Sequence, residues 1–92
     1  MVKMITARDF SKVFPVILKN AREAKGWTQE KCEAETGIKQ GLISKYEDGK
    51  IIPGTINFLN LHAHLRFSPA QILTKIAESF AEEEEKSRKK HE

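Results

Sequence analysis

Apolar residues recur along most of this chain at the three- and four-residue spacings of amphipathic helices, with polar residues between them. No segment shows the sustained alternation of apolar and polar residues that is typical of half-buried strands. The residues that share one face of the fourth predicted helix are Phe58, Leu61, His62 and Leu65. The stripe of the fifth comprises Ile72, Leu73, Ile76, Ala77 and Phe80. The pattern therefore predicts an all-α protein with five helices joined by short loops.

The first long helix is expected to begin at about Pro15 and to end at Lys25 and Gly26. Proline is favoured in the first turn of a helix but disrupts its interior, because it lacks an N–H and clashes with the preceding turn. A basic residue followed by glycine is a typical helix end. The apolar residues of this helix are Phe14, Ile17, Leu18 and Ala21. Before it, Thr6 and Asp9 could cap a separate short helical turn.

Two short helices separated by a glycine turn are predicted between residues 27 and 49. Thr28 is a suitable N-cap for a helix that ends at about Glu35, and Gly37 breaks that helix. The next helix is expected over residues 40–47, and its apolar residues are Leu42, Ile43 and Tyr46. Two short helices joined by a tight turn have the layout of a helix-turn-helix, which places its second helix in the DNA major groove.

The remaining sequence predicts two more helices and a charged end. Thr55 can cap a fourth helix that runs to Leu65, and Ser68-Pro69 is typical of the start of a fifth. From Glu82 onward the chain has no apolar residues. Its acid-first pairs at the i, i+4 spacing are Glu82–Lys86, Glu84–Arg88 and Glu85–Lys89. We expect an N-terminal extension over residues 1–13, one helix-turn-helix domain over 14–80 and a charged tail over 81–92, which prolongs the fifth helix and then frays.

Length and composition favour one small intracellular domain. Ninety-two residues suit a single modest core, and no apolar run is long enough to span a membrane. The first residues lack the apolar stretch of a secretory signal, and a single cysteine, Cys32, cannot form an internal disulfide. We therefore expect a protein of the reducing cytoplasm, not bound to a membrane. No spacing suggests a metal site, a phosphate loop or a nucleophile with its base, so neither a cofactor nor enzymatic activity is expected.

The positive charge of the chain is concentrated around the candidate helix-turn-helix. Residues 1–50 carry ten Lys and Arg against seven Asp and Glu, whereas residues 80–92 carry four against five. The whole chain has a formal net charge of +3. A positive excess in the folded part is the distribution that attraction to DNA phosphates requires.

Several residues at specific spacings resemble the lambda-repressor/Cro-like (Xre-type) helix-turn-helix domains. The matching positions are Arg22, Gly26-Trp27-Thr28-Gln29-Glu30, Gly37-Ile38, Ile43-Ser44, Tyr46-Glu47, Gly49 and Pro53. They agree with the family pattern without a gap, and the likeness extends from about Phe14 to Leu73, two thirds of the chain. The resemblance implies a five-helix fold that binds double-stranded DNA in the cytoplasm, in association with the nucleoid.

The resemblance also implies roles for individual residues. Arg22 and Glu47 match a structural ion pair that ties the first helix to the end of the third. The positions expected at DNA phosphates are Gln29, Lys39, Lys50, Gly54 and Thr55. Those expected at base edges, on the first turns of the third helix, are Gln40, Gly41, Ser44 and Lys45. A glutamine can pair with adenine by two hydrogen bonds, and a lysine can donate to guanine.

The chain departs from the family pattern at positions that bear on DNA binding. Glu33 stands where the family has a small alanine, close under the third helix, so its carboxylate needs a partner or solvent. Gly41 removes a side chain from a reading position. Cys32 and Thr36 are smaller than the usual aliphatic residues, and Arg66 replaces the glycine that commonly follows the fourth helix.

The predicted function is a sequence-specific DNA-binding transcriptional regulator, a repressor in the leading hypothesis, that acts as a homodimer. The dimer could use the stripe from Ile72 to Phe80, that stripe could fold back on Met4, Ile5, Phe10 and Val13, and both can hold at once. The alternative function is an antitoxin, whose protein partner is a toxin, or another protein-interaction module with weak or no DNA readout.

Overall fold

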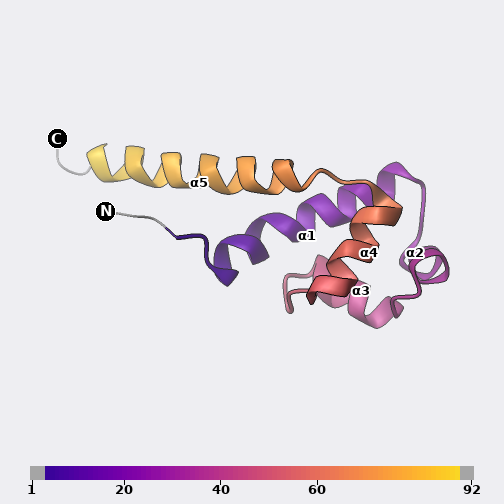
Figure 1. The fold of residues 1–92 in the computed structure, drawn as a ribbon. Coiled ribbons are helices and arrows are strands. Elements are labelled where there is room, and N and C mark those ends of the chain that lie inside the picture. Colours follow the sequence, from indigo (N-terminus) through magenta and orange to yellow (C-terminus); the bar gives the residue numbers. More distant parts are fainter. Residues whose placement is uncertain (1–3, 90–92) are drawn as a thin grey trace.

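The computed structural model describes the backbone of residues 4–89 and the side chains of residues 4–85. This part of the chain contains five helices and no strand, and they are α1 (Ala7–Ala24), α2 (Gln29–Thr36), α3 (Gln40–Glu47), α4 (Thr55–Leu65) and α5 (Pro69–Lys89). The all-α, five-helix prediction is therefore confirmed. Figure 1 shows α5 running back along α1 in the opposite direction, with α2, α3 and α4 gathered beside the C-terminal part of α1.

One apolar core joins all five helices. Its buried members are Phe14, Ile17, Leu18, Cys32, Ile38, Ile43, Tyr46, Leu61, Leu65, Phe67, Ile72 and Ile76. The ring of Phe14 lies at the centre, with ring centroids 5.6 Å from Phe58 of α4 and 5.7 Å from Phe67 of the α4–α5 connection. Edge-to-face and tilted rings at such distances stabilise a core beyond the area that they bury. This aromatic cluster fixes α4 and the start of α5 against α1.

The predicted start of α1 is wrong, since the helix begins eight residues before Pro15, at Ala7. The reason is the capping box between Thr6 and Asp9, in which each side chain accepts a hydrogen bond from the other residue's backbone N–H. These bonds satisfy N–H groups that a helix start leaves open. The proline is buried within the helix rather than at its first turn.

The loop after α3 packs against α1 where the proline interrupts its hydrogen bonds. Gly49 has φ +72°, and a Cβ added to it would lie 3.1 Å from the carbonyl oxygen of Ser11 and 3.6 Å from Cγ of Pro15. Proline lacks the N–H that would normally bond the Ser11 carbonyl, four residues before it. A glycine is needed at this contact both for its backbone conformation and for its lack of a side chain.

The short helices begin and end close to the predicted positions. The Thr28 hydroxyl accepts from the backbone N–H of Lys31, and Gly37 closes α2 with φ +80°. The prediction of Thr55 as the cap of α4 is wrong by one residue, because Gly54 is the N-cap and makes no side-chain bond. The first amides of α4 are thus left without a side-chain cap.

The apolar stripe of α5 packs within its own chain. Ile72 and Ile76 are buried, while Leu73 and Ala77 lie on the outer face, and Phe10 and Val13 pack against the core. Met4 and Ile5 remain exposed, so only part of the expected N-terminal apolar residues contributes. The fold-back arrangement is therefore the one observed.

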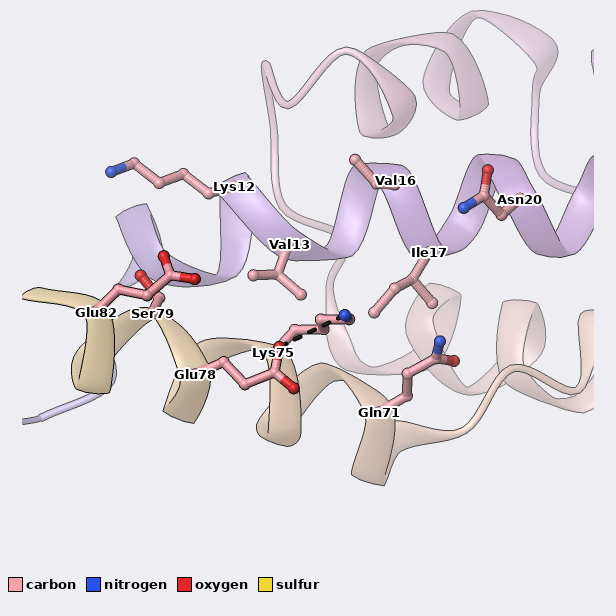
Figure 2. Close-up of a pocket in the computed structure, with 10 residues that line it drawn as sticks. All are labelled: Lys12, Val13, Val16, Ile17, Asn20, Gln71, Lys75, Glu78, Ser79 and Glu82. Atoms are coloured by element: carbon pink, nitrogen blue, oxygen red, sulfur yellow. Dashed lines mark ion pairs between the residues drawn. The ribbon is translucent and has the colours of Figure 1, made fainter.

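Between α1 and α5 lies an open groove of about 380 Å³ (Figure 2). Two residues that line the groove from α5, Lys75 and Glu78, form an ion pair at 3.5 Å. Beside this groove, the buried Ile72 and Ile76 and the partly buried Phe80 pack α5 against the core. The charge pairs predicted for the tail involve side chains after residue 85 and lie outside the described residues. Within the described part of the chain, no helix is long and apolar enough to cross a membrane.

Arg66 closes α4 in a left-handed conformation, with φ 60° and ψ 28°. Replacing Arg66 with glycine should raise the free energy of unfolding by about 0.5–1 kcal/mol, because glycine adopts this conformation without strain. Urea denaturation measures the change. Gly37→Ala is the matched control: its added Cβ would meet no atom within 4 Å, so only backbone strain should lower stability. A loss of stability in Arg66→Gly would contradict the prediction.

Candidate nucleic-acid interface

The turn between α2 and α3 is held by bonds from its own residues. The Thr36 hydroxyl donates to the carbonyl of Cys32 at 2.7 Å and accepts from the backbone N–H of Ile38 at 3.1 Å. Ile38 is buried in the core, and the left-handed Gly37 lets the chain reverse before it. Local hydrogen bonding and one apolar anchor thereby set the angle at which α3 leaves α2.

The ion pair between Arg22 and Glu47 is present and nearly buried, with side chains 10% and 4% exposed. The guanidinium Nε donates to Glu47 Oε2 at 2.7 Å, and a second guanidinium nitrogen donates to Oε1 at 3.0 Å. The third nitrogen donates to the carbonyl of Trp27 at 2.6 Å. The hydrogen bonds to Glu47 raise the pKa of Arg22 above its ordinary value. This pair ties α1, the start of α2 and the end of α3 together.

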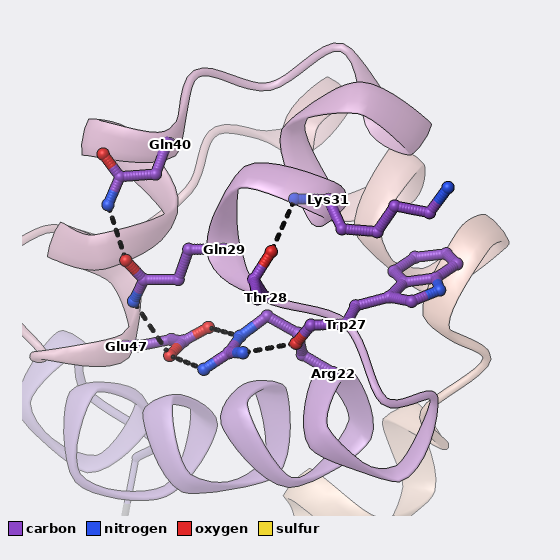
Figure 3. Close-up of polar contacts among 7 residues, drawn as sticks. All are labelled: Arg22, Trp27, Thr28, Gln29, Lys31, Gln40 and Glu47. Carbon is purple, nitrogen blue, oxygen red and sulfur yellow. Dashed lines mark hydrogen bonds and ion pairs between the residues drawn. The ribbon is translucent and has the colours of Figure 1, made fainter.

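A chain of side-chain hydrogen bonds continues from this ion pair to the start of α3 (Figure 3). Gln29 Nε2 donates to Glu47 Oε1 at 3.2 Å, and Gln40 Nε2 donates to Gln29 Oε1 at 2.6 Å. Three residues that the sequence analysis placed at different sites (one at a phosphate, one at a base and one in an ion pair) are therefore in one network. Gln40 is connected to Arg22 through Gln29 and Glu47.

The direction of this chain follows from the chemistry of Glu47. A carboxylate can only accept, so the amide nitrogen of Gln29 must face it and the amide oxygen must face away. That oxygen in turn requires the nitrogen of Gln40 to point towards it. The Gln40 amide is thus held in one of its two orientations, with its oxygen and its second N–H directed away from Gln29.

The other candidate contact residues lie on the surface without joining this network. Ser44 is partly buried on α3, and the remaining ones are exposed: Lys39, Gly41, Lys45, Lys50, Gly54 and Thr55. A Cβ at Gly41 would meet nothing within 4 Å, so open space surrounds this position. The structure brings together Arg22, Gln29, Gln40 and Glu47, and it leaves the three candidate lysines as exposed positive charges.

Sequence reasoning missed the partner of Glu33. Its carboxylate Oε1 accepts from the backbone N–H of Gln40 at 2.6 Å, across the turn. That Glu33 needs a partner was evident, because its carboxylate stands where the family has a small alanine. The identity of that partner was not, because the bond to the Gln40 N–H depends on the angle between α2 and α3. Among the described side chains, no buried nitrogen or oxygen atom lacks a hydrogen-bond partner.

Tyr46 and His62 each join two parts of the fold by a hydrogen bond. Tyr46 is buried, and its hydroxyl accepts from the Asn57 amide at 2.9 Å, which links α3 to α4. His62 Nδ1 donates to the carbonyl of Phe67 at 2.7 Å, since a carbonyl can only accept.

The described residues contain no group of His, Cys, Asp and Glu side chains that could hold a metal ion. Burial raises the pKa of the Cys32 thiol, as for a packed rather than a reactive cysteine.

Comparison with protein families agrees with this geometry. Residues 18–72 match a family model described as helix-turn-helix, and this range contains the whole Arg22–Glu47–Gln29–Gln40 network. No curated protein matches the chain.

Removing the charge of Glu47 should lower the free energy of unfolding. Glu47→Gln leaves Arg22 buried without its counter-charge and places an N–H₂ group among donors, so unfolding should become easier by about 3 kcal/mol or more. Thermal and urea denaturation test this expectation.

Glu78→Gln is the matched control, because it makes the same change in the exposed Lys75–Glu78 pair. It should alter the free energy of unfolding by less than about 0.5 kcal/mol. Equal losses of unfolding free energy in Glu47→Gln and Glu78→Gln would show that the Arg22–Glu47 pair stabilises the fold no more than an exposed ion pair does.

Proposed function

Because the chain belongs to the helix-turn-helix family of DNA-binding regulatory domains, we propose that it is a sequence-specific transcriptional repressor. In this proposal α3 enters the major groove and its first turns meet base edges. The protein acts on double-stranded DNA, in the cytoplasm at the nucleoid, and it uses no cofactor.

The observation that carries the proposal is the fixed amide of Gln40. Its Nε2 is bound to Gln29, and Gln29 is bound to the buried Glu47. The free oxygen and the second N–H of Gln40 match the N6 donor and N7 acceptor of adenine. An amide held before DNA arrives loses little conformational entropy on binding, which favours selective readout. Ser44 and Lys45 follow it along α3 as further base contacts, and Gly41 lets the backbone approach the bases closely.

The proposed phosphate contacts surround this reading position. Lys39 and Lys50 are exposed on either side of α3 and supply positive charge. Gly54 and Thr55 begin α4, where no side chain caps the first amides, so these amides can bind an anion. Gln29 has a second amide hydrogen that can reach a phosphate while its first remains on Glu47. These contacts would set the position of α3 on the duplex.

We further propose that the repressor is a homodimer, since one inserted helix reads only a few base pairs. The buried isoleucines of α5 are used within the chain, so we place the dimer contact on another surface. Aliphatic side chains are exposed next to the start of α4, at Ile51, Ile52, Ile56 and Leu59. Ile56 and Leu59 are three residues apart and share one side of α4. To bind a palindromic site, such a dimer would need both α3 helices on one side of the duplex, about 34–36 Å apart.

Selection from a randomised duplex pool, followed by affinity measurements across a salt series, tests DNA recognition. An enriched palindrome is expected. Gln40→Ala should relax preference at one base pair of each half-site at a cost of about 1–3 kcal/mol, because it removes the bidentate contact.

Lys39→Ala is the comparison for that variant, and it should weaken binding to all sequences alike and lower the salt slope by about one. Unchanged base preference in Gln40→Ala would contradict its role as a reader. A steep salt slope without any enriched sequence would mean phosphate attraction alone.

Analytical ultracentrifugation tests the dimer. Ile56→Glu should weaken self-association by at least about tenfold, because a charge would be buried in the aliphatic face. Leu73→Glu, at a similarly exposed leucine on α5, is the control and should leave the dimer intact. A wild-type monomer at high micromolar concentration would contradict the homodimer, and a dimer lost only in Leu73→Glu would move the interface to α5.

A second candidate is an antitoxin or another protein-interaction module with weak or no DNA readout. The observation that favours it is the length of α5, which extends past the N-terminal end of α1 (Figure 1) and carries four exposed glutamates over residues 82–85. A protein that selects no duplex sequence in the pool experiment would support this alternative over the repressor.

A further inference from the structure

The recognition helix α3 has no capping side chain of its own. Its N-cap, Lys39, makes no side-chain bond to the helix start, whereas Thr6 and Thr28 cap α1 and α2. The carboxylate of Glu33 takes that place from α2, seven residues earlier, by accepting from the Gln40 N–H at 2.6 Å. A negative charge at a helix N-terminus also interacts favourably with the helix dipole.

Gln40 is consequently held to α2 at two points. Glu33 binds its backbone N–H, and Gln29 binds its side-chain amide, both at 2.6 Å. The first bond fixes where the Cα of Gln40 lies relative to α2, and the second fixes the orientation of its amide. A side chain with three rotatable bonds reaches a defined point only if its backbone is fixed as well.

Gly41, the neighbour of Gln40, makes the position of the Gln40 side chain more important. Gly41 has no side chain and open space around it, so the first turn of α3 depends on Gln40 for side-chain readout. Two of the departures from the family pattern, Glu33 and Gly41, thus adjoin the same residue, Gln40.

Resting on the proposed function, we infer that Glu33 is a positioning residue for base recognition, whose carboxylate holds the Gln40 backbone so that the Gln40 amide meets its base in one geometry. The effect acts through Gln40 and not through a direct contact between Glu33 and DNA. Removal of the carboxylate should therefore reduce discrimination at the base pair that Gln40 reads and leave preference elsewhere in the site unchanged.

The experiment uses the full chain and the duplex that the wild type selects. Affinity is measured for that duplex and for versions changed at the base pair that Gln40→Ala identifies. Glu33→Ala should lower the ratio of these affinities by about three- to tenfold, part of what a bidentate amide–adenine contact contributes. Glu33→Gln keeps an oxygen that can accept from the Gln40 N–H, and it should recover the ratio to within about twofold.

A double-mutant comparison separates positioning from general stability. Gln40→Ala retains the backbone N–H, so Glu33 still caps α3 in that background. Adding Glu33→Ala to Gln40→Ala should then lower thermal stability as before but cause no further loss of base discrimination. A further loss of base discrimination on adding Glu33→Ala to Gln40→Ala would overturn the inference. An equal change in the affinity of Glu33→Ala for all sequences would also overturn it.

Two more variants control for charge and for folding. Glu30→Ala removes an exposed carboxylate from the same helix, and it should change overall affinity without changing the ratio. If Glu33→Ala does not fold, Glu33→Asp keeps the charge with a shorter reach and should show the same loss of discrimination. A wild type without base preference overturns the proposed function and this inference together. A wild type whose preference survives both Glu33→Ala and Glu33→Asp overturns the inference alone.

Discussion

The buried ion pair between Arg22 and Glu47 is the interaction on which the arrangement of this domain depends. Taking two charges out of water is costly, and only close geometry with additional hydrogen bonds offsets that cost. Here Arg22 donates to both carboxylate oxygens and to the Trp27 carbonyl, and Glu47 also accepts from Gln29. One pair therefore connects three helices, and its carboxylate determines the direction of every hydrogen bond from there to Gln40.

The domain separates a rigid frame from a sparse reading face. The frame consists of the aromatic cluster around Phe14, the left-handed glycine turns and the network around the buried ion pair. The face in front of it consists of exposed lysines, a partly buried serine and a glycine. Such a division suits a DNA-binding domain, because phosphate attraction needs exposed charge whereas discrimination between bases needs a side chain in a fixed position. Gln40 is the residue at which the two parts meet.

Local signals in the sequence predicted most of the helix boundaries, and the failures have physical causes. Thr28 and Gly37 act through neighbouring residues only, so their effects could be read without the fold. Pro15 was misplaced because its general preference for a first turn was outweighed by the capping box at Thr6 and Asp9 and by packing against Gly49. Gly54 rather than Thr55 caps α4, a shift of one residue that backbone conformation decides. The route of α5 was left open because its isoleucines could pack within the chain or against a copy of it.

The sequence by itself determined the helical class through its periodicity, and the frame and the ion pair through its resemblance to a known family. Only the tertiary structure decided that Gln29, Gln40 and Glu47 form one directed chain and that Glu33 accepts from the backbone N–H of Gln40. Those contacts join side chains and backbone atoms across a turn whose angle is set by the core beneath it. A hydrogen bond tolerates only a few tenths of an ångström, and residue spacing along a chain does not specify positions to that accuracy.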